Sequence, residues 1–185
     1  YYDEAQQLLK DGLRSNPNSK ELLSKQFQLY ESRQNRQAAS GVIKKLHSLY
    51  PRDTDIKEKH DAYAFEEAKI EFNQQNYREA IPAFTALHES KEYGTFALQY
   101  LFSIYMAQKN YEDASKTLES LIKKHPDKQK YILNKMELLT AMGNYEEAYE
   151  MALDYDGRYP RDTEYASMLN EVSVAYIKYL NENED

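Results

Sequence analysis

Apolar residues recur along the chain at helical spacing, and short polar breaks separate the apolar stretches. One stretch carries Ala114, Leu118 and Leu121 on a single helical face, as expected for a helix that buries one side. Gly and Pro number only five each, which favours long helices over many turns. The pattern predicts antiparallel helix pairs over residues 19–50, 54–90, 95–125 and 129–159, with single helices over 2–15 and from Thr163 to about Leu180.

An internal repeat underlies this pattern. Five short polar segments each end in an alanine, and successive alanines are 34, 41, 34 and 34 residues apart. These alanines are Ala5, Ala39, Ala80, Ala114 and Ala148. Twelve residues after four of them stands a proline, at Pro17, Pro51, Pro126 and Pro160. The string YPRDT therefore occurs twice, over 50–54 and 159–163, because the chain is an array of repeats.

Polar residues at the expected helix ends support the same division. An Asn stands three positions before an acid in a pattern typical of helix N-termini, at Asn76/Glu79, Asn110/Asp113 and Asn144/Glu147. Each proline stops a helix, and a new N-cap is expected after it, at Asn18-Ser19, Asp53-Thr54, Asp127 and Asp162-Thr163. The repeat without a proline has Glu92 at that place, and we expect Gly94 to end its helix.

A unit of two helices, with Asn-Tyr-x-x-Ala at the turn and proline at the end, resembles the tetratricopeptide repeat family. The clearest copies run over 109–126 and 143–160, and the resemblance covers essentially the whole chain. HEAT-type helical repeats are usually longer and lack this turn. The resemblance implies an all-α fold, a right-handed α-solenoid of antiparallel helix pairs with about ten helices.

The repeats predict one tetratricopeptide-like domain over residues 1–185. It divides into a half repeat 1–17, repeats 18–53, 54–94, 95–128 and 129–162, and a half repeat 163–185. Both end helices carry apolar residues where a natural solenoid end is usually polar. We therefore expect a fragment of a longer protein, with homo-oligomerisation through the open ends as a further possibility.

The repeat after the first YPRDT is seven residues too long, which is two helical turns. We expect an overlong helix from about Thr54 to Gln74, with Ile56, Tyr63 and Ile70 on one stripe. The added length either marks the start of a larger three-repeat unit or is neutral drift. Pro82 falls inside the following helix and predicts a kink or a late helix start there.

Charge and composition exclude several function classes. The net charge of −7 disfavours nucleic acid and anionic membrane surfaces, which both attract basic proteins. No apolar run is long enough for a membrane-spanning helix, so we expect no membrane insertion. The chain has no cysteine, which removes disulfides and thiolate chemistry. A soluble chain is expected, and the cytoplasm and the periplasm or cell envelope both stay open as its compartment.

No catalytic motif is present, and no cofactor or metal site is expected. The sequence lacks a Gly-rich phosphate loop, a G-x-S-x-G motif and an H-E-x-x-H motif. His47 and His88 occupy the same place in successive repeats, where they could come near each other, but surface positions are the simpler interpretation. We therefore expect a chain that is not an enzyme.

The resemblance implies a concave groove lined by the first helix of each repeat. Mapping that groove onto this chain gives candidate binding residues Gln28, Lys69, Phe96, Gln99, Ser103, Met106, Lys130 and Glu137. The helix over 96–106 is apolar nearly all round and should be buried on most sides. The alternative is that Phe96 and Met106 pack against the overlong helix. Where chaperone-binding members clamp a C-terminal carboxylate, only Lys130 matches, so that ligand is not expected.

The function expected from the sequence is a non-enzymatic protein–protein interaction scaffold that binds a peptide or partner protein in the groove. Two alternatives remain. The array could be a structural spacer or assembly subunit whose groove is filled by its own chain or a second copy. It could also be the substrate-selecting repeat region of a larger enzyme.

Overall fold

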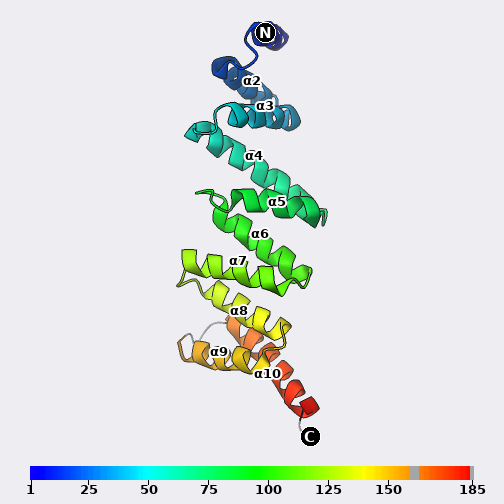
Figure 1. Cartoon of the computed structure of the whole chain (residues 1–185), viewed down its shortest axis with the longest axis vertical. Helices are drawn as coiled ribbons and strands as arrows, with labels where there is room; N and C mark the ends of the chain where they lie inside the picture. The colour runs from blue at the N-terminus through cyan, green and yellow to red at the C-terminus, as the bar shows by residue number, and fades with distance from the viewer. Residues whose placement is uncertain (159–162, 184–185) are drawn as a thin grey trace. The chain divides into compact units, whose positions relative to one another are not determined.

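The computed structural model describes residues 1–158 and 163–183, and this part of the chain folds into ten α-helices without a strand (Figure 1). The helices are α1 Tyr2–Ser15, α2 Lys20–Ser32, α3 Arg36–Leu49, α4 Thr54–Asn73, α5 Tyr77–Leu87, α6 Gly94–Ala107, α7 Tyr111–Lys124, α8 Gln129–Ala141, α9 Tyr145–Arg158 and α10 Thr163–Asn183. The predicted all-α solenoid of antiparallel helix pairs is confirmed, and the predicted helix boundaries agree to within a few residues at nearly every end.

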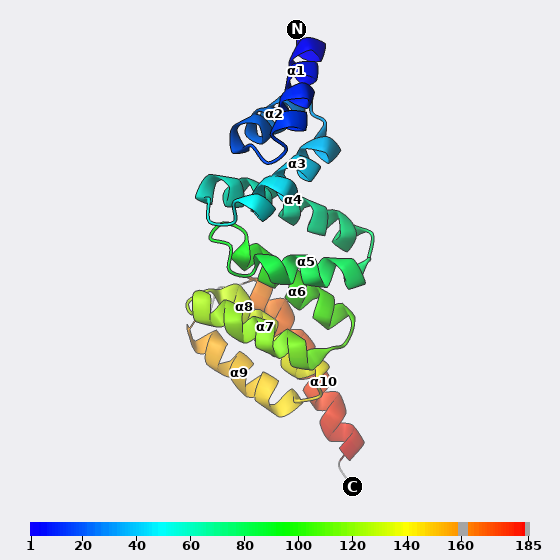
Figure 2. The same cartoon turned by 45° about the horizontal axis from the view of Figure 1, so that its top comes forward.

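Two compact units make up the chain, Tyr1–Ala83 and Phe84–Asp185, and the division falls within α5. In the first unit, α2 packs against α1 and α3, and α3 packs against α4. In the second unit, α6 to α9 pack in succession, and α10 contacts both α8 and α9 (Figure 2). The two predicted half repeats thus supply α1 and α10, and the division of the chain into repeats stays a prediction.

The turn between the two helices of a repeat has a constant backbone form. Four residues just before the Asn of this turn have a positive φ, namely Gln34 (56°), Gln75 (60°), Lys109 (56°) and Gly143 (82°). Asn35 and Asn110 then accept a hydrogen bond from the backbone N–H three residues on, at 3.1 and 3.4 Å. The left-handed residue reverses the chain, and the Asn side chain starts the second helix.

Small residues allow the helices of a repeat to pack closely. The repeat alanines Ala39, Ala80, Ala114 and Ala148 are all 0 % exposed. Two of these alanines belong to apolar cores, Ala39 to one in the first unit and Ala148 to one in the second. The first-unit core includes Leu23, Phe27, Val42, Ile43, Leu46 and Ile56. The second-unit core includes Leu133, Met136, Ala152, Tyr155, Tyr165 and Val172. The recurring alanine is therefore a packing requirement of the repeat.

The first YPRDT copy behaves as predicted. Tyr50 ends α3, and its hydroxyl donates a hydrogen bond of 2.6 Å to the Asn18 carbonyl oxygen. Asp53 caps α4 by accepting from the Ile56 N–H at 3.0 Å. In the second copy, residues 159–162 lie outside the described part of the chain, as does the predicted cap Asp162, and Thr163 begins α10.

Gly94 was expected to end a helix, and this prediction is wrong. Helix α5 already ends at Leu87, and Gly94 is the first residue of α6. A Cβ atom at Gly94 would lie 2.5 Å from the His88 carbonyl oxygen, closer than real Cβ atoms come. A glycine is needed here because the backbone of His88, just after the end of α5, lies against this position.

Two other predicted helix ends are also wrong. Lys128, not Asp127, is the N-cap of α8, and it makes no side-chain capping bond. Helix α5 does not start late, although Pro82 lies inside it. Its start is set by Asn76, whose carbonyl accepts from the N–H groups of Glu79 and Ala80, both at 3.0 Å. A kink at Pro82 stays a prediction.

The overlong α4 is confirmed, but its predicted apolar stripe is only partly buried. Helix α4 has 20 residues against 14 in α3. Ile56 is buried, whereas Ile70 is 50 % exposed. The guanidinium of Arg36, the first residue of α3, lies 4.0 Å from the carboxylate of Glu66 on α4. Ile70 is four residues after Glu66, so it lies one helical turn beyond this contact. The helix α6 is less buried than predicted, because Phe96 is 52 % exposed.

Candidate functional site

Two parallel rows of side chains meet between α6 and α8. On α6 the row is Gln99, Ser103 and Met106, and on α8 it is Lys130, Asn134 and Glu137. Both rows follow the spacing i, i+4, i+7, which places three side chains along one face of a helix. The two rows and Phe102 line a hollow of about 270 Å³. We call it the α6/α8 hollow.

Five of the eight candidate binding residues line this hollow. They are Gln99, Ser103, Met106, Lys130 and Glu137. Phe96 lies on α6 outside the lining. Gln28 and Lys69 belong to the other unit, where Gln28 accepts a hydrogen bond from Lys25 and Lys69 pairs with Glu66 at 2.9 Å. A binding role for any of the eight stays a prediction.

Gln99 has a structural role as well as a place in the hollow. Its side-chain amide donates a hydrogen bond of 2.9 Å to the hydroxyl of Tyr131, which is 1 % exposed. The Ser103 hydroxyl donates to the Gln99 carbonyl oxygen within the same helix, at 3.1 Å. The α6 row is therefore held in place by bonds inside the protein.

The α8 row is different, because its polar groups have no partner in the described part of the chain. Among the described residues, the side chains of Lys130, Asn134 and Glu137 make no hydrogen bond or ion pair. The hollow is thus lined by one cationic, one neutral and one anionic side chain, and none of them has a hydrogen-bond partner among the described residues.

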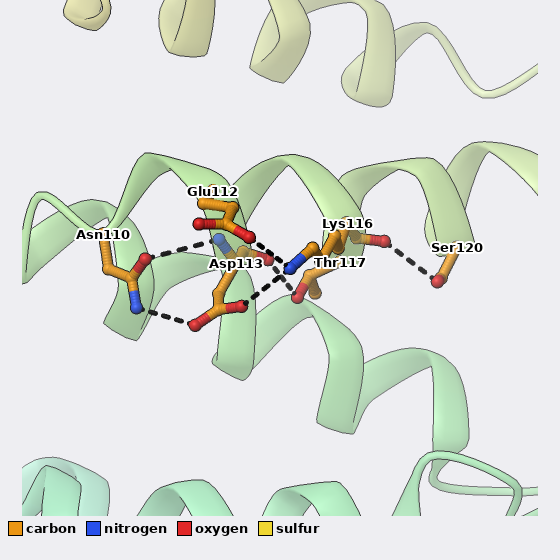
Figure 3. A network of polar contacts seen from close by, with 6 residues as sticks. All are labelled: Asn110, Glu112, Asp113, Lys116, Thr117 and Ser120. Carbon is orange, nitrogen blue, oxygen red and sulfur yellow. Dashed lines mark hydrogen bonds and ion pairs between the residues drawn. The ribbon is translucent and has the colours of Figure 1, made fainter.

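The polar side chains of α7 shown in Figure 3 differ from the α8 row, because they are hydrogen-bonded or ion-paired within their own helix. Its exposed Lys116 pairs with Glu112 at 2.6 Å and lies 3.7 Å from Asp113. Thr117 and Ser120 donate to carbonyl oxygens one turn back, at 2.7 and 3.0 Å. These polar residues of α7 are thus satisfied by their own helix, unlike those of the α8 row.

The hollow carries opposite charges at its two ends. Lys130 lies at the end nearer the start of α8, and Glu137 lies two turns further on. Partial burial raises the pKa of Glu137, and the negative charge of Glu171 on α10 raises it further. The carboxylate end is therefore short of compensating positive charge.

Sequence reasoning missed two lining residues, Phe102 and Asn134. Asn134 follows Lys130 by four residues, so extending the α8 row at helical spacing would have included it. Phe102 is 5 % exposed and lines the hollow. An apolar pattern alone cannot distinguish such a buried lining residue from a core residue.

The predicted surface position of His47 is wrong, because its ring is half-buried against another histidine. Its ring stacks on His60 of α4, with centroids 4.2 Å apart. The Nδ1 atoms of both rings are buried without a hydrogen-bond partner, and that of His60 lies 3.5 Å from Asp61. Over residues 1–158 and 163–183, no group of three or more potential metal ligands was found. Nor is any helix in that part long and apolar enough to cross a membrane.

Comparison with known proteins supports the repeat interpretation. A family model described as tetratricopeptide repeat matches residues 72–134. No match was found among curated protein sequences. Among solved structures, the chain is similar to PilW, a widely conserved type IV pilus biogenesis factor, with a TM-score of 0.52 and 15% identity over 91% of this chain and 90% of that one.

A second similar structure is a tetratricopeptide repeat protein from Parabacteroides merdae ATCC 43184. Its TM-score is also 0.52, with 17% identity over 96% of this chain and 68% of that one. At these identities the likeness concerns the fold. The fold of the chain is thus like that of tetratricopeptide repeat proteins, and the family model itself matches residues 72–134.

Proposed function

We propose that this chain is a non-enzymatic interaction scaffold that holds an extended peptide segment of a partner protein in the α6/α8 hollow. The observation that carries the proposal is the unsatisfied α8 row of Lys130, Asn134 and Glu137. A single strand of peptide offers backbone donors and acceptors along its length, which suit Asn134 and the Ser103 hydroxyl. The apolar floor at Phe102 and Met106 would take a side chain of the peptide.

The repeat fold supports this class of function, since solenoids of stacked repeats present extended binding surfaces. The net charge of −7 argues for a protein partner over nucleic acid. An assembly or spacer role would need no open polar hollow, and a substrate-selecting role beside an enzyme would use the same hollow for a peptide substrate.

The test compares two serine variants that differ in position alone. Ser103→Arg places a long cationic side chain in the hollow. Ser120→Arg is the matched control, because Ser120 is also exposed and also bonds the carbonyl oxygen four residues back, but on α7. Gln99→Arg is a poorer choice, because it would remove the partner of the Tyr131 hydroxyl.

A peptide-display library is selected against the immobilised wild-type chain, and the enriched peptides are measured on all three proteins. We expect enriched peptides to bind wild type and Ser120→Arg alike and to lose at least tenfold in affinity, about 1.4 kcal/mol, on Ser103→Arg. If no peptide is enriched, or if Ser103→Arg binds as well as wild type, the proposal is wrong. The spacer role would then be the better account.

A further inference from the structure

We infer that the α6/α8 hollow selects its peptide by a pair of opposite charges, taking an acidic side chain at Lys130 and a basic side chain, about three residues away, at Glu137. This inference rests on the proposed function and adds the chemistry of the ligand to it. It is carried by the opposite charges at the two ends of one hollow and by the absence of a partner for either within the described residues.

The length of the hollow sets the spacing of the ligand charges. Lys130 and Glu137 are seven residues apart on α8, so they lie about 10.5 Å apart along the helix axis. An extended peptide in the polyproline II conformation rises about 3.1 Å per residue and repeats its direction every third residue. Peptide side chains three residues apart therefore lie on one side, about 9.3 Å apart, which matches the α8 row.

Binding of a basic peptide side chain at Glu137 is the more strongly favoured of the two charge contacts. Glu137 lies beside Glu171 of α10, and the two negative charges together with partial burial raise the pKa of Glu137. A cationic side chain placed there would offset both the repulsion and the loss of water. Ser167 on α10 is the only described residue that donates to Glu171, at 3.5 Å, and it carries no charge.

The acidic end of the peptide meets a lysine that the fold leaves available. Other lysines of the same unit do have a carboxylate close by, since Lys116 on α7 pairs with Glu112 at 2.6 Å and Lys178 on α10 with Glu182 at 3.8 Å. Lys130 has none among the described residues. A peptide carboxylate would provide a charge-assisted hydrogen bond that water only partly replaces.

Between the charges, the hollow favours small or apolar residues. Asn134 on α8 and Ser103 on α6 both line the hollow, where they would bond the backbone of the peptide. Phe102 and Met106 offer apolar contact. The inferred ligand is thus an extended segment with one acid and one base separated by two uncharged residues.

The experiment measures charge preference with peptides blocked at both ends, so that terminal charges play no part. The library carries acidic, basic or neutral residues at two positions three apart, in all combinations, with uncharged random residues elsewhere. It is screened on wild type, Lys130→Glu, Glu137→Lys and the control Lys135→Glu. Lys135 lies on α8 outside the lining, so its variant changes the net charge without changing the hollow. Circular dichroism melting verifies that each variant folds.

We expect wild type and Lys135→Glu to prefer one acid with one base. Lys130→Glu should bind peptides with two basic residues about tenfold more tightly than peptides with one acid and one base. Glu137→Lys should show the same preference for peptides with two acidic residues. Peptides that bind without any charge preference, or whose preference is unchanged in both variants, overturn the inference of a charge pair. In that case loss of binding on Ser103→Arg still upholds the peptide-binding function. Absence of any peptide binding overturns both.

Discussion

Gln99 of α6 and Tyr131 of α8 are joined by a 2.9 Å hydrogen bond beside the hollow. Tyr131 is 1 % exposed, so its hydroxyl depends on this amide for a partner. The bond links two helices that are not neighbours in the chain. One residue of the candidate site thereby also helps to fix the distance between the two rows.

The first prediction concerns this bond. Gln99→Ala should lower the free energy of unfolding by about 1–3 kcal/mol, because it leaves a buried hydroxyl unsatisfied. Tyr131→Phe removes the hydroxyl itself and should cost less in the Gln99→Ala background than in wild type. Urea unfolding of the four proteins in a double-mutant cycle measures the coupling. Additive effects would mean that the bond contributes nothing.

The second prediction concerns the repeat alanines. Ala114 is 0 % exposed, and Ala114→Leu should destabilise the chain by about 1–3 kcal/mol by overfilling the contact between helices. Ala5 holds the same place in the first half repeat but is only half-buried on α1. Ala5→Leu should therefore change stability by less than about 0.5 kcal/mol. Thermal and urea unfolding measure both, and equal losses would contradict the packing role.

The third prediction contrasts two helical glycines. At Gly94 an added Cβ would meet the His88 carbonyl oxygen at 2.5 Å, so Gly94→Ala should destabilise the chain by about 1–3 kcal/mol. At Gly41, inside α3, an added Cβ would have no atom within 4 Å. Gly41→Ala should stabilise by about 0.5–1 kcal/mol, because alanine is the better helix former. The opposite signs are the test, and urea unfolding provides it.

The fourth prediction concerns pH. Burial, reinforced by the neighbouring His47, lowers the pKa of His60 below its usual 6.5. The unfolded chain then binds this proton more readily, so the contribution of His60 to stability is complete above about pH 6.5 and is lost as the pH falls toward the folded pKa. Asp61 opposes the shift and Lys44 adds to it.

Urea unfolding at about pH 7.5 and about pH 5.5 measures this effect. The wild type should lose more stability between the two than His60→Gln, which cannot titrate there. His125→Gln is the control for replacing a histidine outside the stacked pair, since that ring is exposed. An equal loss in wild type and His60→Gln would show that the stacked pair does not control the response.

The sequence predicts the parts of the fold that depend on local signals. The alanine spacing located the buried contacts at Ala39, Ala80, Ala114 and Ala148, and the first YPRDT marked the end of α3 and the start of α4. It failed at Gly94, because a glycine that ends one helix and a glycine that begins the next have the same local signature. The close approach of the His88 carbonyl, which decides the matter, arises only when α5 and α6 are in place.

The candidate site could be predicted only through the family resemblance, which implied a groove along the first helix of each repeat and so gave Gln99, Ser103 and Met106. What periodicity could not show is which polar groups stay unsatisfied. Gln99 turned out to be bonded to Tyr131, whereas Asn134 has no partner among the described residues. The stacking of His47 on His60 likewise depends on the register between α3 and α4.

Within each unit, the helices that contact one another are sequence neighbours or have a single helix between them. Forming such contacts closes only short loops, so each unit should assemble quickly and from more than one starting point. Loss of structure should be equally local. Amide hydrogen exchange would then show protection that falls from the inner helices toward α1 and toward the end of α10, in place of one value for the whole chain.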